Sequence, residues 1–273
     1  AILSPVLLVF METRHFATGG DIYRAPSLIE AGLQVCSMLA MAIGLERLSV
    51  RTGSIVHNVG ALVVTAVAGL FIVFGLFMLE MPMIWRVDVG GLVWNQLLLA
   101  YALPAGLVLA PSYTDAGRRP AGYANALAGV ALVLALTYVT LQVRRFFHGP
   151  VLSGGSTTDA EQYAYSLAWL TFGVVLLVVG LVFASQRARL ASAVLIGLTV
   201  LKAFLFDMAN LTGVFRALSF MGLGLVLVAI GWLYQRILFR RAPPPPETAA
   251  GELASPALLV SSPPARRSFR APA

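Results

Sequence analysis

Apolar residues fill long stretches of this chain, and polar residues interrupt them only briefly. Each stretch approaches the roughly 20 helical residues that cross the hydrocarbon core of a membrane. Strict alternation of apolar and polar residues is absent, which argues against a transmembrane barrel. We therefore expect an all-α, polytopic transmembrane helical bundle with seven full spans, at Leu28 to Leu45, Val59 to Leu79, Val93 to Ala110, Tyr123 to Val143, Gln162 to Ala184, Ala191 to Phe206 and Ala217 to Tyr234.

The composition fits a protein that lies in lipid. Of the 273 residues, 59% are hydrophobic and 11% are charged, and the mean hydropathy is +0.84. Soluble domains carry about 25% charged residues. The net charge is +7, but the basic residues flank the apolar stretches in pairs and form no single stripe with interleaved aromatics. We therefore expect the lipid bilayer, including anionic lipid, as the partner of these charges, and no nucleic acid.

The two ends of the chain differ from the middle. Ala1 to Phe10 is apolar but too short to span a membrane, and no basic leader or small-residue cleavage site stands before Glu12. We expect a truncated helix there and not a signal peptide. Residues 240–273 are rich in Pro, Ala and Ser and include four consecutive prolines from Pro243. This composition predicts a disordered tail after a helical bundle of residues 1–239.

The basic residues also predict an orientation. Nine flank one set of span ends: Arg47, Arg51, Arg118, Arg119, Arg187, Arg189, Arg236, Arg240 and Arg241. Six flank the other set: Arg14, Arg24, Arg86, Arg144, Arg145 and Arg216. Cytoplasmic loops carry the excess of Lys and Arg. We therefore expect the tail in the cytoplasm.

An internal repeat is the strongest organisational signal after hydropathy. The run ETRHF from Glu12 and the run QVRRF from Gln142 share their spacing. Each run ends an apolar stretch, leads into a Gly-containing loop and is followed by two spans. Helices four apart in order have the same orientation, so we expect two parallel four-helix repeats, residues 1–110 and 121–239.

Small residues predict where helices approach each other closely. Gly32, Cys36, Ala40 and Gly44 form one stripe at four-residue spacing. Helices in lipid associate through such small residues, because hiding apolar surface gains little there. The pairs Gly173 with Gly180 and Gly224 with Gly231 are similar seams. Dimerisation through one of these faces is the alternative to packing within the bundle.

Several segments resemble a known family. These are EQYAYSLAWL from Glu161, GLTVLKAFLFDMANLTGVFRALSFMGLGL from Gly197, GWLYQRIL from Gly231, NQLLLAYALPA from Asn95 and RRFFHGPVLSGG from Arg144. They resemble the C-terminal part of the bacterial membrane protein family known as domain of unknown function 2339, over about Glu12 to Leu238. The resemblance implies a bacterial inner membrane and a longer chain with more spans upstream. It implies no established activity.

Ionisable residues inside spans are the first candidates for function, because a charge at mid-bilayer costs at least about 2.5 kcal/mol. Lys202 either reaches the nearby membrane surface with its ammonium or pairs with Glu30 or Asp207 across helices, at a cavity for an anionic substrate. Glu30 has a second interpretation, because a carboxylate at a helix N-terminus meets the helix dipole favourably. Asn95 and Tyr101 complete this candidate intramembrane polar cluster.

Basic residues beside glycines and aromatics suggest a second candidate site on the predicted outer side. This candidate anion or lipid-headgroup site consists of Arg14, His15, Arg144, Arg145, His148, Lys202 and Arg216. Arginine forks and Gly backbone amides suit a phosphate group. The alternative is an anchoring belt of basic and aromatic residues at the membrane surface.

Catalytic patterns are otherwise scarce. His15, His57 and His148 show no metal-ligand spacing, and no Gly-rich nucleotide loop is present. Ser166 and Ser219 have no base nearby in sequence. We therefore expect no catalytic residues, no metal and no cofactor, and we do not favour an enzyme.

The sequence leaves three function classes. We favour a cell-envelope scaffold or assembly component, which fits small-residue seams and few charges in spans. The alternative is a transporter or flippase-like carrier of an anionic or lipid-linked substrate, which parallel repeats and Pro104 within a span favour. A lipid-linked glycan or acyl transferase is a weaker third. The expected partners are other membrane proteins or a second copy of the chain.

Overall fold

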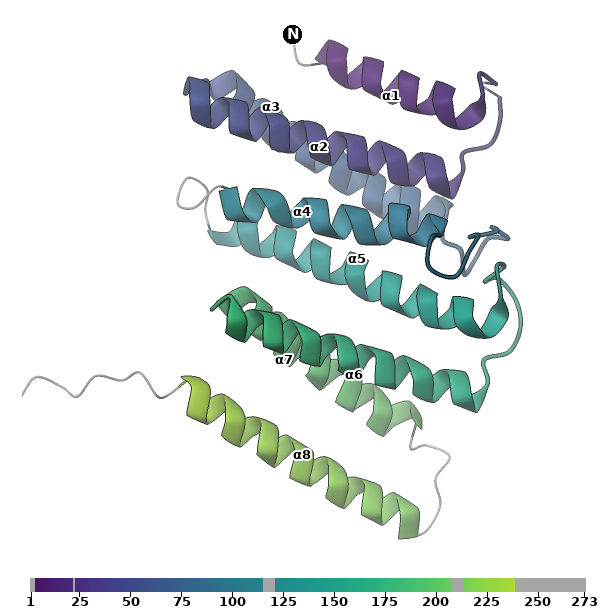
Figure 1. Cartoon of the computed structure of the whole chain (residues 1–273), viewed down its shortest axis with the longest axis vertical. Helices are drawn as coiled ribbons and strands as arrows, with labels where there is room; N and C mark the ends of the chain where they lie inside the picture. The colour runs from purple at the N-terminus through teal and green to yellow at the C-terminus, as the bar shows by residue number, and fades with distance from the viewer. Residues whose placement is uncertain (1–2, 22, 115–120, 208–213, 239–273) are drawn as a thin grey trace, which may run out of the picture. The chain divides into compact units, whose positions relative to one another are not determined.

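Helices are the regular secondary structure of the part of the chain that the computed structural model describes, residues 3–21, 23–114, 121–207 and 214–238, and loops connect them. The all-α prediction is confirmed there. The helices (Figure 1) are α1 (Leu3–Thr18), α2 (Leu28–Thr52), α3 (Ile55–Leu70), α4 (Leu103–Thr114), α5 (Ala121–His148), α6 (Asp159–Val182), α7 (Gln186–Lys202) and α8 (Val214–Leu238), with π-helical segments η1 (Phe71–Leu79), η2 (Leu98–Ala102) and η3 (Ala203–Asp207). The predicted tail lies outside the described residues.

Five helices in the described residues are long and apolar enough to cross a membrane, where the sequence predicted seven. They are Leu28–Thr52, Ile55–Leu79, Gly122–His148, Asp159–Val182 and Gln186–Phe206. The predicted third span shortens to Leu98–Ala110, because the residues before it form turns around Gly90 and Gly91. The apolar part of the seventh shortens to Phe220–Arg236. At about 1.5 Å per residue, Leu98–Ala110 does not cover a core of about 30 Å. The whole of α8 has 25 residues and is long enough, so the seventh span stays a prediction.

Residues 1–216 form one compact unit, in which neighbouring helices pack in pairs. The closest pairs are α6 with α7, α2 with α3 and α4 with α5 (Figure 1). A second unit begins at Ala217, so most of α8 is a separate element.

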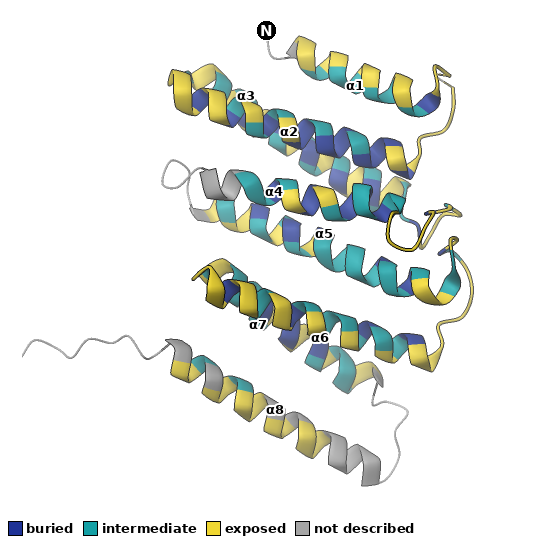
Figure 2. Ribbon diagram, in the orientation of Figure 1, coloured by how far each residue is buried: buried dark blue, intermediate teal, exposed yellow. Residues whose placement is uncertain are grey.

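Helix α2 is the centre of the buried core. It contacts α1, α3, η1, η2 and α4, and its buried residues include Leu28, Val35 and Leu39. Figure 2 shows buried positions concentrated along α2, whereas α6 carries many exposed ones. Exposed apolar side chains such as Val178 suit a face toward lipid, which is as apolar as the side chains themselves.

Two helical hairpins of this unit match each other in detail. Gly53 (φ 65°) ends α2 and Ala184 (φ 49°) follows α6, and both adopt the left-handed conformation. A serine follows each, Ser54 before α3 and Ser185 before α7. Both α3 and α7 continue into a π-helical segment. These correspondences support the expected repeat, which itself stays a prediction.

The small-residue seam predicted from Gly32 to Gly44 is confirmed over half of its length. A Cβ atom on Gly32 would lie 2.9 Å from the Cα of Ala100, and the Cys36 thiol donates to the carbonyl of Leu99 at 3.6 Å. By contrast, a Cβ on Gly44 would meet nothing within 4 Å among the described atoms. The seam therefore joins the first half of α2 to η2.

The second predicted seam joins α6 to α7. A Cβ on Gly173 would lie 2.8 Å from Ile196, and one on Gly180 would lie 2.8 Å from the backbone of Arg189. The third pair, Gly224 and Gly231, lies on α8, where an added Cβ would meet no described atom within 4 Å.

Gly32→Ala is expected to destabilise the bundle, because the new methyl group would overlap the backbone of Ala100. Overpacking of this kind costs about 1–3 kcal/mol. Gly44→Ala, on the same helix but with open space around it, is the matched control. Thermal unfolding of both variants in detergent checks this, and equal shifts of Tm would contradict it.

Candidate functional site

Arg144 donates hydrogen bonds from all three nitrogens of its guanidinium. It lies near the end of α5 and is 6% exposed. Its Nε donates to the carbonyl of Leu152 at 2.8 Å, and one terminal nitrogen donates to the carbonyl of Gly154 at 2.9 Å. The other terminal nitrogen donates to Glu161 Oε1 at 3.1 Å. The guanidinium therefore fastens the loop after α5 to the start of α6.

Glu161 receives this arginine in the first turn of α6. It is fully buried, and its backbone N–H donates to Oγ1 of the capping residue Thr158 at 3.3 Å. Oε1 also accepts a hydrogen bond from the Tyr165 hydroxyl at 2.6 Å. Oε2 lies 3.5 Å from His148 Nδ1, too far for a good hydrogen bond. Glu161 Oε2 and His148 Nδ1 are both buried, and neither has a hydrogen-bond partner among the described residues.

The same arrangement recurs where α1 meets α2. Arg14 donates to Glu30 Oε1 at 2.8 Å and to the carbonyl of Arg24 at 3.3 Å. Ser27 caps α2 and accepts from the backbone N–H of Glu30. Gln34 donates to Glu30 at 3.2 Å, one turn on, where Tyr165 stands relative to Glu161. We call these two arrangements the Arg14–Glu30 elbow and the Arg144–Glu161 elbow.

The two elbows differ in how well they exclude water. The Arg14 side chain is 24% exposed, whereas that of Arg144 is 8% exposed. Removal of the glutamate therefore leaves the charge of Arg144 buried away from water, whereas the charge of Arg14 can still contact water.

A histidine lies against a glycine in the loop of each elbow. Gly20 (φ 92°) and Gly155 (φ 77°) adopt the left-handed region that favours glycine. A Cβ on Gly155 would lie 2.9 Å from the His148 ring, and one on Gly20 would lie 3.3 Å from the His15 ring. These glycines therefore set the loop path and make room for the imidazoles.

Arg145 and Asn95 connect α5 to the segment before η2. Arg145 donates twice to the carbonyl of Gly90, at 3.1 and 2.6 Å. Asn95 donates to Gln142 Oε1 at 2.9 Å, and its own side-chain oxygen accepts from the backbone of Leu98. Asn95 is thus a helix cap as well as a tether to α5.

Lys202 lies at the junction of α7 and η3 and reaches α6. Its ammonium donates to Ser166 Oγ at 2.6 Å and to the carbonyl of Gln162 at 3.1 Å. The described bonds of Lys202 and Glu30 thus go to different helices and give no support to a pair between them. Tyr101, buried in η2, donates to the carbonyl of Leu76 at 3.0 Å. The side chains of Asp207 and Arg216 lie outside the described residues.

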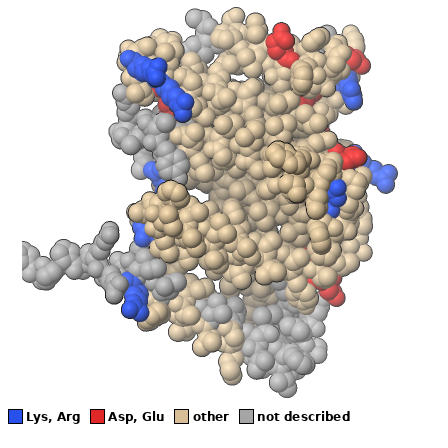
Figure 3. Space-filling view, in the orientation of Figure 1, with Lys and Arg blue, Asp and Glu red and all other residues tan. Residues whose placement is uncertain are grey.

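Most of the charged side chains visible in Figure 3 lie near the ends of helices, with an uncharged surface between them. That distribution is typical of helices that cross a membrane. The family model for predicted membrane proteins of domain of unknown function 2339 (DUF2339) matches residues 1–237. The chain belongs to this family. No curated protein and no solved structure matches it.

The family match confirms the resemblance found in the sequence and the membrane location. It assigns no activity, because DUF2339 is described only as a predicted membrane protein. Within the described part of this DUF2339 chain, no group of three or more His, Cys, Asp or Glu residues is placed to hold a metal ion.

Glu80 is a charged residue of this DUF2339 chain that the sequence analysis missed. It follows η1 and lines a cavity of about 470 Å³ together with Ser27, Arg86 and Gln96. Burial raises the pKa of the Glu80 carboxyl above its usual value, and the negative charge of Glu30 raises the pKa further. An acidic residue at a helix C-terminus opposes the dipole, and that sequence signal was available.

The sequence analysis also did not name Glu161 as a candidate functional residue. The spacing Ser27-x-x-Glu30 and Thr158-x-x-Glu161 is that of a capping box. That spacing, found at both predicted repeats, marks the two helix starts. It does not reveal that each glutamate turns to an arginine from the preceding helix.

Glu161→Ala is expected to destabilise the protein by roughly 3–5 kcal/mol, because it leaves the buried Arg144 without its carboxylate. Glu30→Ala is expected to cost less, since Arg14 is partly exposed. Chemical unfolding in detergent measures both. Equal costs for Glu161→Ala and Glu30→Ala would refute the role of burial.

The pH dependence of stability should report on Glu80. Its folded pKa is raised, so its favourable contribution is fully present below the unfolded pKa and is lost as the pH rises through the folded pKa. Glu80→Gln should therefore change stability little in acid and increase it at neutral pH. The measurement is the free energy of unfolding of the natural chain and of Glu80→Gln across this pH range. A variant that is more stable than the natural chain only in acid would contradict the raised pKa.

Proposed function

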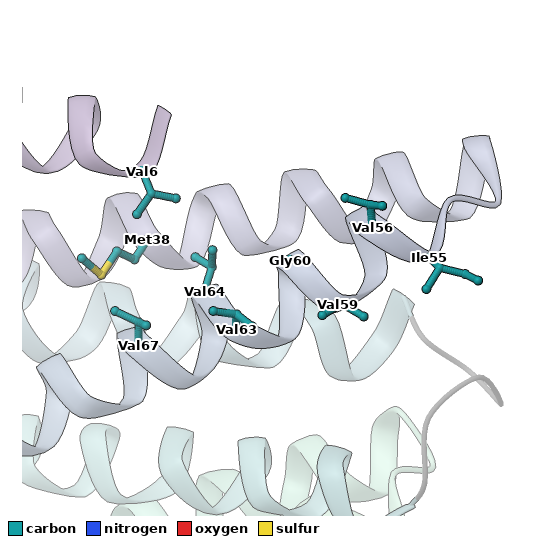
Figure 4. A pocket seen from close by; sticks show the side chains of 9 residues that line it. All are labelled: Val6, Met38, Ile55, Val56, Val59, Gly60, Val63, Val64 and Val67. Atoms are coloured by element: carbon teal, nitrogen blue, oxygen red, sulfur yellow. The ribbon is translucent and has the colours of Figure 1, made fainter. Parts of the chain in front are cut away.

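We propose that this chain is a cell-envelope scaffold or assembly component of the bacterial inner membrane, and that its bundle docks a transmembrane helix of another membrane protein. The observation that carries the proposal is an open apolar groove between α1, α2 and α3. It has a volume of about 480 Å³ and is lined by Val6, Met38, Ile55, Val56, Val59, Gly60, Val63, Val64 and Val67 (Figure 4).

The lining of this α1–α3 groove suits a helix better than a polar substrate. Most of it comes from α3, whose Val56, Val59 and Val63 are 51–65% exposed. Figure 4 shows Val6 of α1 and Met38 of α2 on the opposite side. Gly60 lies among the valines and lets a partner backbone approach closely.

The second hairpin shows what kind of element fits. There, α4 packs against α5, and side chains of α4, α5, α6 and α7 together line one cavity. Ala191 in that cavity stands six residues after Ser185, as Gly60 stands six residues after Ser54. Helix α4 packs on α5 and forms one wall of this cavity, on the side of the second hairpin that corresponds to the open α1–α3 groove. A transmembrane helix with small residues is the matching occupant.

The charged residues favour a scaffold over a carrier. The carboxylates of Glu30 and Glu161 each bind an arginine, and Lys202 binds α6. A carrier of an anionic substrate needs cations that the substrate itself can engage, whereas Arg14 and Arg144 hold helices together. A carrier, or a transferase, therefore has less support. We further propose a cytoplasmic position for the end that carries Arg47, Arg51, Arg187 and Arg189.

A photoreactive p-benzoylphenylalanine placed at Val63 tests the docking of a helix in living cells. Val178 on α6 is the matched control, because it is 53% exposed and Val63 is 56% exposed, and it does not line the groove. We expect a protein adduct at position 63 only, and Gly60→Trp should abolish it by filling the groove.

Three outcomes would overturn the proposal. Adducts with lipid alone at both positions would show that the groove faces the bilayer. An adduct of twice the chain mass would identify a second copy and not another protein. A protein adduct that persists in Gly60→Trp would place the contact outside the groove.

A further inference from the structure

The cavity lined by α4, α5, α6 and α7 is a second candidate site, and its ligand does not depend on whether the α1–α3 groove docks a helix. It has a volume of about 340 Å³, and its walls come from α4, α5, α6 and α7. Alanines such as Ala105, Ala131 and Ala191 line it together with Phe172 and Leu176. Because these residues belong to helices that cross the membrane or lie beside such helices, the cavity is an apolar slot at bilayer depth.

This slot ends in a polar pocket. Ser185 and Arg187 line the slot and also line a neighbouring pocket of about 490 Å³, to which Asn125 and Gln186 contribute. Arg187 is exposed, and its Nε donates to Asn125 Oδ1 at 3.2 Å. The apolar slot and the polar pocket are therefore continuous through Arg187.

The position of Arg187 along the membrane matches that of a lipid headgroup. The candidate span Gln186–Phe206 begins one residue before it, so the guanidinium lies at the end of the apolar region. The N-terminus of α7 adds a partial positive charge at the same place. A guanidinium with a planar fork binds phosphate through two hydrogen bonds.

We propose that this joint cavity binds one anionic phospholipid, with the phosphate at Arg187 and Asn125 and an acyl chain in the slot between Ala131, Leu176 and Ala191. The matched hairpin supplies an internal comparison. Two residues after Ser54, where Arg187 follows Ser185, the chain has Val56. The α1–α3 groove is thus apolar at the corresponding point, and the charge belongs to the second hairpin.

Native mass spectrometry of the full chain with phosphatidylglycerol or phosphatidylcholine tests the site. We expect one retained phosphatidylglycerol in the natural chain and about tenfold weaker retention in Arg187→Gln, since a charge-assisted contact to the phosphate is lost. Arg51→Gln is the matched control, because Arg51 is an exposed arginine in the last turn of α2, before the corresponding turn of the first hairpin. Retention should be unchanged in that variant.

Filling the slot tests the acyl chain separately. Ala131→Phe leaves Arg187 in place and should reduce retention of phosphatidylglycerol, and Ala191→Val is the smaller replacement if the phenylalanine variant fails to fold. The proposal is overturned if Arg187→Gln retains the lipid as the natural chain does, if both arginine variants lose it equally, or if phosphatidylcholine is retained as well as phosphatidylglycerol. Undiminished retention in a folded slot variant would also overturn it.

Discussion

A carboxylate buried at the start of a membrane helix needs a cation close by, because neither lipid nor water is there to stabilise its charge. Among the described residues, two such carboxylates each bind an arginine from the end of the preceding helix. Arg14 binds Glu30 and Arg144 binds Glu161. Each pair fixes the angle at which one helix follows another, and in each a hydroxyl caps the second helix. The positions of α2 and α6, and of the hairpins that they begin, follow from these two contacts.

The two hairpins share their elbows and turns but differ in what lies against them. Helix α4 and the side chains of α5 to α7 enclose a slot that ends at Arg187, whereas α1 to α3 leave an open groove of valines. Two hairpins of similar structure thus present surfaces of different chemistry. The open groove suits a helix, and the slot with its polar end suits a lipid.

Particular residues show how far prediction from sequence reached. Hydropathy located the helices α2, α5 and α6, because a run of about twenty apolar residues in lipid satisfies its own backbone hydrogen bonds as a helix. Small residues located Gly32 and Gly180 at close contacts, as their spacing suggested. The same pattern failed at Gly44, because spacing along one helix does not say where the neighbouring helix ends. The span expected from Val93 was too long, because glycine turns before Asn95 take up residues that look apolar in sequence.

The sequence alone determined the membrane environment and the helical class, because these depend on composition and on the length of apolar runs. It also determined the family, because segments such as EQYAYSLAWL from Glu161 resemble that family. It also showed which residues carry charge, but not which of them meet. Only the tertiary structure decided that Glu30 turns to Arg14, that Lys202 reaches α6, and that Arg187 closes an apolar slot. These contacts join residues between 16 and 62 positions apart. Helix packing sets such distances, and no local pattern along the chain encodes them.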